Sequence, residues 1–238
     1  MKFVKLLIGV LLLPACAALT LAAWRVARQL SFGQVLTDST VWGFVAGYAL
    51  WLAVFAFLPK PMRTYVLGHE LTHAFWALLM GARVGGLKVK KTGGQVRTSK
   101  TNWFIALAPY FFPFYALLFI ALFFIAHAIW NLERYMWVLF FLVGLGWSFH
   151  VTFTLMMVLT TKQPDIESQG ALFSAVVIYC MNLLVMALMV AALSRSVTFA
   201  MLARSLGGSL GATYGWTLDK LAALWHHAAA FGRHTRQH

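Results

Sequence analysis

Long apolar runs separated by short polar segments dominate the chain. A helix that crosses a bilayer needs about 20 apolar residues, and six stretches of this sequence come close to that length. They are Val4–Ala23, Val41–Leu58, Tyr65–Met80, Trp103–Ala126, Tyr135–Leu159 and Ala171–Leu193. We therefore predict an all-α integral membrane protein of about six transmembrane helices. The third run is short for a full span.

The first apolar run has two interpretations. Lys2 and Lys5 stand at its start, as basic residues do in a signal peptide, and Leu13–Cys16 resembles a lipoprotein cleavage site. Pro14 is unusual at such a site, and the apolar run continues beyond Cys16. We expect an uncleaved first transmembrane helix, with a cleaved signal peptide as the alternative.

A segment rich in glycine and lysine separates the third run from the fourth. Hydrophobic and polar residues alternate over Leu87–Lys90 and over Gln95–Thr98, and Thr92–Gly94 lies between them. Alternation on both sides of a glycine-rich turn is typical of a β-hairpin. Two strands alone are marginal in water. We therefore predict a hairpin insertion at about 84–100 that packs on the helices or enters the membrane interface.

The chain changes character after the sixth run. Leu221, Leu224 and Trp225 recur at helical spacing, and polar or basic residues lie among them. This pattern predicts an amphipathic, basic C-terminal tail over 195–238 that lies on a membrane surface. Residues 1–194 form the predicted membrane domain.

Composition excludes a soluble domain. The chain is 61% hydrophobic and 11% charged, with a mean hydropathy of +0.78, whereas soluble chains carry about 25% charged residues. Lipid must therefore solvate much of the surface. We expect a multi-pass protein of a cell membrane, prokaryotic in origin.

The formal net charge of +13 points to the lipid bilayer as a partner. Lys and Arg lie between and after the apolar runs, where they anchor loops to anionic headgroups. Outside the apolar runs the chain has no basic stripe interleaved with aromatic residues. The sequence therefore does not indicate nucleic acid as a partner. Cys16 and Cys180 both lie in apolar runs and form neither a disulfide framework nor a metal-ligand spacing. We interpret them as small buried hydrophobic residues.

The third run contains His69-Glu70-Leu71-Thr72-His73. A spacing of four residues places both imidazoles on one face of a helix, one turn apart, where two neutral nitrogens can bind one zinc ion. Glu70 follows the first imidazole directly, so its carboxylate can take a proton from water at the metal. This is the pattern of zinc metalloproteases.

The position of Glu70 strengthens this interpretation. It is the only carboxylate inside any of the six apolar runs, and a charged side chain at the centre of a bilayer costs about 2.5–3.5 kcal/mol. A polar cluster that joins helices is the alternative. That alternative explains a polar group in lipid, but it does not explain the spacing of His69, Glu70 and His73.

Zinc needs a third protein ligand, and two residues are candidates. Asp165 precedes the sixth helix and could fold back to the metal, although it could instead cap that helix. His150 lies inside the fifth helix at a depth that roughly matches His73. It could also bond a neighbouring helix or orient a ligand from behind.

Gly68–His73, together with the glycine-rich Gly93–Val96, resembles the site-2 protease family of intramembrane zinc metallopeptidases. The resemblance covers Gly68 to about Asn182. In that family a transmembrane helix bears two zinc histidines and a catalytic glutamate, and a short membrane-associated sheet follows. A later transmembrane segment supplies an aspartate, often within Leu-Asp-Gly.

The resemblance implies that His69 and His73 are zinc ligands, that Glu70 is the catalytic base and that Asp165 is the third ligand. Gly170 follows Asp165 only at some distance, so there is no Asp-Gly pair, and Asp165 starts a helix instead of lying within one. His150 therefore stays open as an alternative third ligand or as a residue that orients a ligand.

These inferences predict a metalloprotease with one Zn²⁺ per chain that hydrolyses a membrane protein or peptide substrate. Asn102 and Asn182 could hold the substrate backbone or stabilise an oxyanion, or they could join helices. An extended substrate could pair with the hairpin over Leu87–Thr98. The alternatives are a metal-binding transporter, a protease-like protein without activity, and a hydrolase of a lipid-linked amide.

Overall fold

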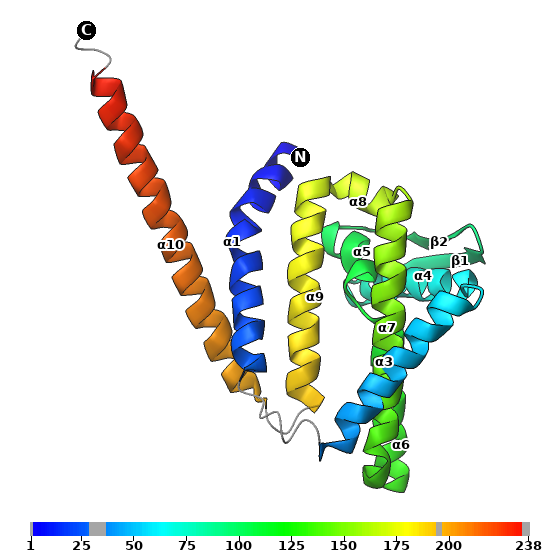
Figure 1. The fold of residues 1–238 in the computed structure, drawn as a ribbon. Coiled ribbons are helices and arrows are strands. Elements are labelled where there is room, and N and C mark those ends of the chain that lie inside the picture. The colour runs from blue at the N-terminus through cyan, green and yellow to red at the C-terminus, as the bar shows by residue number, and fades with distance from the viewer. Residues whose placement is uncertain (1, 29–36, 194–196, 235–238) are drawn as a thin grey trace. The chain divides into compact units, whose positions relative to one another are not determined.

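The computed structural model describes residues 2–28, 37–193 and 197–234 (Figure 1). These residues form helices and one two-stranded antiparallel sheet, which confirms the predicted helical class and the hairpin. The helices are α1 (Lys2–Ala27), α3 (Ser39–Phe57), α4 (Met62–Leu79), α5 (Trp103–Leu107), α6 (Phe114–Trp130), α7 (Met136–Thr160), α8 (Pro164–Gln169), α9 (Ala171–Leu193) and α10 (Phe199–His234). Two short 3-10 helices, η1 (Ala108–Tyr110) and η2 (Glu133–Tyr135), and the strands β1 (Val84–Lys90) and β2 (Gly93–Thr98) complete the set.

Four of the described helices are long and apolar enough to cross a membrane, namely α1, α3, α7 and α9. A fifth span is possible if α5–η1 and α6 count together, although the two are bent by 83° at their junction. A multi-pass membrane protein is therefore supported, with four to five candidate spans where the sequence predicted six.

The apolar run that carries the His-Glu motif is not among the candidate membrane spans of the described residues. It forms α4, which has 18 residues and does not qualify as a span among the described helices. Arg63, His69, Glu70 and His73 all lie in this helix and lower its hydropathy. These polar residues thus interrupt the apolar length that a span requires.

The fourth predicted run is broken where its two prolines lie. Pro109 is part of η1, and Pro113 stands immediately before α6. Proline lacks an amide hydrogen and cannot continue a helical ladder. Tyr110 and Phe111, at this break, are almost fully buried.

The chain divides into two compact units. One comprises Met1–Leu30 with Ala175–His238, and the other comprises Ser31–Ser174. In the first unit, Ser205 donates to the Ala22 carbonyl at 3.1 Å and Tyr214 to the Leu11 carbonyl at 2.8 Å, so α10 packs along α1.

The predicted amphipathic tail corresponds mainly to α10. The side chains of Leu221, Leu224 and Trp225 are 57–73% exposed, and their position at a membrane surface stays a prediction. Residues 195–196 and 235–238 of the predicted tail lie outside the described residues.

The second unit is built on the pair α3 and α7. A Cβ added at Gly47 would overlap the Phe141 carbonyl, and one added at Gly144 would overlap the Phe44 carbonyl. Glycine at these points lets the two helix backbones approach closely, as small residues do in membrane helix pairs.

The hairpin lies against α4 (Figure 1). Its register pairs Lys90 with Gly93 at the turn and Leu87 with Val96 further along. Val89 packs on a cluster of Trp51, Tyr65, Val66, Phe149 and Phe153 from α3, α4 and α7. The packing of a short hairpin on helices follows the sequence prediction and anchors it next to the His-Glu motif.

Candidate metal centre

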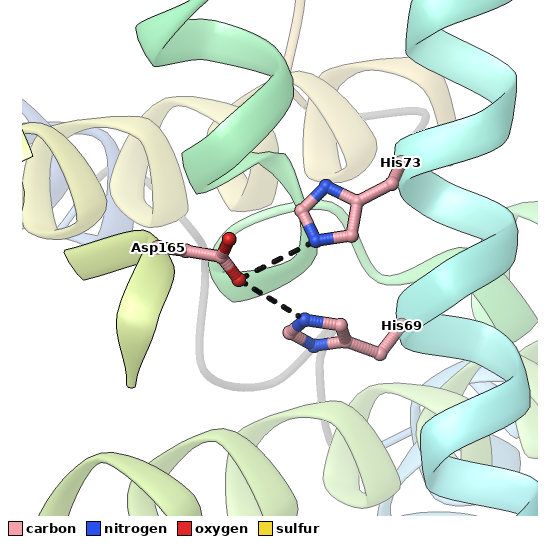
Figure 2. Close-up of side chains that lie close together, drawn as sticks. All are labelled: His69, His73 and Asp165. Atoms are coloured by element: carbon pink, nitrogen blue, oxygen red, sulfur yellow. Dashed lines mark ion pairs between the residues drawn. The ribbon is translucent and has the colours of Figure 1, made fainter. Parts of the chain in front are cut away.

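α4 presents its two histidines on one face, as their spacing predicts. The ring centroids of His69 and His73 are 4.9 Å apart, and the two side chains are only 11% and 12% exposed. Both imidazoles point into the same space (Figure 2).

Asp165 meets the two imidazoles from α8. Its Oδ2 atom lies 3.4 Å from Nε2 of His69 and 3.4 Å from Nε2 of His73 (Figure 2). α8 begins at Pro164, a favoured residue in the first turn of a helix. It ends at Gln169, and the next residue, Gly170, has a φ of 95° that suits glycine. This short helix therefore returns toward α4 and delivers the carboxylate.

The two distances to Asp165 are longer than direct hydrogen bonds and match the spacing expected of two ligands of one zinc ion. Charge-assisted N–H···O bonds are about 2.7–2.9 Å long. Two ligand atoms at about 2.0–2.1 Å from zinc, set at a tetrahedral angle, lie about 3.3–3.4 Å apart. His69, His73 and Asp165 form the one group among the described residues that could hold a metal ion, with potential ligand atoms within 4.8 Å of one another.

The second nitrogen of each imidazole also has a partner. Nδ1 of His73 lies 2.8 Å from the Ile105 carbonyl, so the Nδ1–H donates there and Nε2 keeps its lone pair. Nδ1 of His69 lies 3.4 Å from the Tyr65 hydroxyl. Such partners orient histidine ligands toward a metal.

The electrostatics favour a charged carboxylate at Asp165. Burial raises the pKa of this carboxyl, but the two neighbouring imidazoles of His69 and His73 outweigh that effect and hold the pKa well below its usual range. Asp165 is therefore an ionised oxygen donor at neutral pH, which is the form that binds zinc.

Glu70 lies beside this group and under the hairpin. It is 7% exposed, and its carboxylate accepts a hydrogen bond from the backbone N–H of Val96 in β2. The backbone of Gly94 is so close that an added Cβ would lie 2.8 Å from Oε1 of Glu70. The strand thus holds the one carboxylate of α4 in place.

A cavity of about 650 Å³ opens on the site. It exposes His69, Glu70, His73 and Asp165 to the same space, and β2 forms one wall from Gly93 to Val96. The other contributors come mainly from α4, α5 and the α7–α8 connection. This volume accommodates water and a segment of polypeptide.

The other predicted site residues lie elsewhere. His150 is buried and lines a separate cavity of about 20 Å³ behind His69, and it does not belong to the metal-ligating group. The Asn102 side chain accepts from the Ile105 backbone N–H at 2.9 Å and caps α5. Asn182 belongs to the other unit, where its amide donates to the Ile178 carbonyl at 2.8 Å.

Two residues at the site were not predicted from the sequence. The single hydroxyl hydrogen of Tyr110 is shared by two acceptors, Oε1 of Gln163 at 3.1 Å and Oδ2 of Asp165 at 3.3 Å. For each of these two residues, the sequence contains a feature that could have indicated a role at the site. Tyr110 is a polar side chain between two prolines in an apolar run, and Gln163 lies two residues before Asp165.

Comparisons of the chain with family models, with curated proteins and with solved structures found no match. The function is therefore inferred from the geometry of the site.

Proposed function

We propose that the protein is an intramembrane zinc metalloprotease that hydrolyses peptide bonds of membrane-associated substrates. One observation carries the proposal: a nitrogen from each of His69 and His73 and an oxygen from Asp165 converge beside the Glu70 carboxylate. All four side chains line one cavity that is large enough for water and a peptide.

Each residue then has a defined role. His69, His73 and Asp165 would hold the metal, and three protein ligands are the number that catalytic zinc sites use. Zinc supplies a Lewis acid that polarises a carbonyl and lowers the pKa of water toward 7. Glu70 accepts a proton from the attacking water and later returns it to the leaving amine.

The hairpin supports a way to hold the substrate. Among the described residues β2 pairs with no strand besides β1, and Gly93–Val96 of this strand line the cavity. An extended peptide can add to the edge of a sheet through backbone hydrogen bonds. Replacing the hairpin with a flexible linker is expected to abolish cleavage, and full cleavage by that variant would exclude strand addition.

Zinc content and the effect of a Glu70→Gln change test the proposal together. We expect one zinc ion per chain by mass spectrometry in both the wild-type protein and the variant. New protein termini in membranes of cells that express the wild-type chain should be absent with Glu70→Gln, because loss of a general base costs about 10²–10⁴-fold in rate.

A transporter or an inactive protease-like protein would give another result. Membranes containing the wild-type chain and the Glu70→Gln variant would then show the same protein termini. A wild-type protein without stoichiometric zinc would also exclude the proposed function.

The ligand set has its own test. Asp165→Ala is expected to reduce zinc binding strongly, since it removes one of three ligands. His150→Ala is the matched control, because His150 lies on the other side of His69 and outside the ligand group. Zinc loss with His150→Ala and not with Asp165→Ala would reverse the assignment of the third ligand.

A further inference from the structure

We propose that Tyr110 is a positioning residue that holds Asp165 in the orientation needed to bind the metal. This inference rests on the proposed zinc site. The hydroxyl of Tyr110 donates to Oδ2 of Asp165 at 3.3 Å. That oxygen is the same atom that faces Nε2 of both His69 and His73.

The position of Tyr110 follows from the break in the fourth apolar run. Pro109 and Pro113 interrupt the helix there, so η1 turns the Tyr110 side chain toward α8. Tyr110 is fully buried. A buried phenol normally keeps its hydroxyl bonded, and at this point of the fold its acceptors are Asp165 and Gln163.

Asp165 needs such support because its own helix is short. α8 has six residues, and the Asp165 side chain is 31% exposed, far more than either histidine. A partly exposed carboxylate can turn away from the metal into water. The Tyr110 hydroxyl disfavours that rotation, because it adds a donor on the metal side of the carboxylate.

The same tyrosine also contacts the first histidine and the connection to α7. Its ring packs edge-on against the ring of His69, with centroids 5.4 Å apart. Gln163, which accepts its hydroxyl, donates in turn to the Met157 carbonyl at 3.3 Å. Tyr110 therefore links α4, α8 and the end of α7 at the centre where the metal ligands meet.

Tyr110→Phe keeps the ring and removes only the hydroxyl. We expect the affinity for Zn²⁺ to fall about 10–100-fold, as is typical when a partner of a metal ligand is lost. The measurement is competition for Zn²⁺ against a chelator with the purified full chain in detergent. The absorption spectrum of the Co²⁺-loaded variant should also shift, since the carboxylate is less well fixed.

Tyr115→Phe is the matched control. Its hydroxyl donates to the Thr64 carbonyl at 2.6 Å, and it lies in the same unit without bonding a metal ligand. This variant should bind Zn²⁺ with wild-type affinity. Unfolding temperatures of the metal-free proteins show whether either change acts through stability alone.

If Tyr110→Phe does not fold, Gln163→Leu tests the same hydroxyl, because it removes the competing acceptor and leaves the one O–H of Tyr110 to Asp165. Zn²⁺ affinity should then stay at the wild-type value or rise, and a loss of affinity would contradict the inference. The inference is overturned if Tyr110→Phe binds Zn²⁺ as the wild type does, or if Tyr115→Phe loses as much affinity. These results leave the proposed protease intact when Glu70→Gln still abolishes cleavage. Weaker zinc binding in Tyr110→Phe, with cleavage unaffected by Glu70→Gln, would support the role of Tyr110 and exclude the protease.

Discussion

At Gly94 the hairpin comes closest to the side chain proposed as the catalytic base. A Cβ at this position would lie 2.6 Å from Cγ1 of Val66 and 2.6 Å from Cγ of Glu70. Real Cβ atoms do not approach other carbons that closely, so one of the two elements would have to move. The carboxylate of Glu70 is held by the neighbouring backbone of β2, so it would move with the strand.

Gly94→Ala is therefore expected to impair catalysis and to leave metal binding unchanged. A displacement of about 1 Å in a reacting group can cost about 10²-fold in rate, so we expect a fall of about 10–100-fold in cleavage. The zinc content should stay at the wild-type value, because the three atoms nearest to the added methyl group belong to Glu70 and Val66 and to none of the proposed ligands. Gly86→Ala is the control, since an added Cβ there meets nothing within 4 Å. Equal rates for Gly94→Ala and the wild type would contradict the close fit.

Among the elements, α3 and α7 form a pair that packs against α4, the helix that carries His69 and His73. Tyr65 of α4 stacks on Phe153 of α7 with ring centroids 4.8 Å apart, and Trp51 of α3 donates to Thr152 of α7 at 2.8 Å. A movement of α3 away from α7 would therefore also displace α4, the helix that carries the two histidines.

Gly47→Ala tests this packing. The added methyl group would overlap the Phe141 carbonyl, and overpacking of this kind typically costs about 1–3 kcal/mol. We expect a lower unfolding temperature of the detergent-solubilised protein and weaker zinc binding. Gly211→Ala in α10 is the control, because nothing lies within 4 Å of its Cβ position. An unfolding temperature for Gly47→Ala at or above the wild-type value would show that the helices are not in such close contact.

Local patterns predicted some elements well and failed for others. The alternation around Thr92–Gly94 indicated the hairpin, because strand periodicity and turn chemistry depend on adjacent residues. The spacing of His69 and His73 likewise predicted their shared face. The number of spans was overestimated, because run length alone does not weigh the polar residues of α4 or the 83° bend beside Pro113.

The third ligand depends on how distant segments meet. Asp165 and His150 were both consistent with the sequence, and only the return of α8 toward α4 distinguishes them. Tyr110 was missed for the same reason. Its partner Asp165 lies 55 residues further along the chain, so no local pattern indicates the contact.

At the scale of the whole molecule, the first helix packs with the last third of the chain in one unit. Thr20 of α1 and Tyr179 of α9 have hydroxyl oxygens 2.7 Å apart. Arg25 donates to Ser209 of α10 at 3.1 Å. Since α1 has partners in both later helices, we expect it to stay in the mature protein. That expectation remains a prediction, and a pair of cysteines offers a direct test.

The Sγ atoms of Cys16 in α1 and Cys180 in α9 lie 3.6 Å apart, and both thiols are free. Mild oxidation of the membrane-embedded protein with copper phenanthroline is expected to join them in an intramolecular disulfide, because a small side-chain movement brings the sulfurs into bonding range. Maleimide labelling followed by intact-mass spectrometry should count two reactive thiols before oxidation and none afterwards. In a Cys16→Ser control, the remaining thiol should stay reactive. Removal of the first helix as a signal peptide would leave one thiol that oxidation does not pair within the chain, and this result would contradict the packing of α1 against α9.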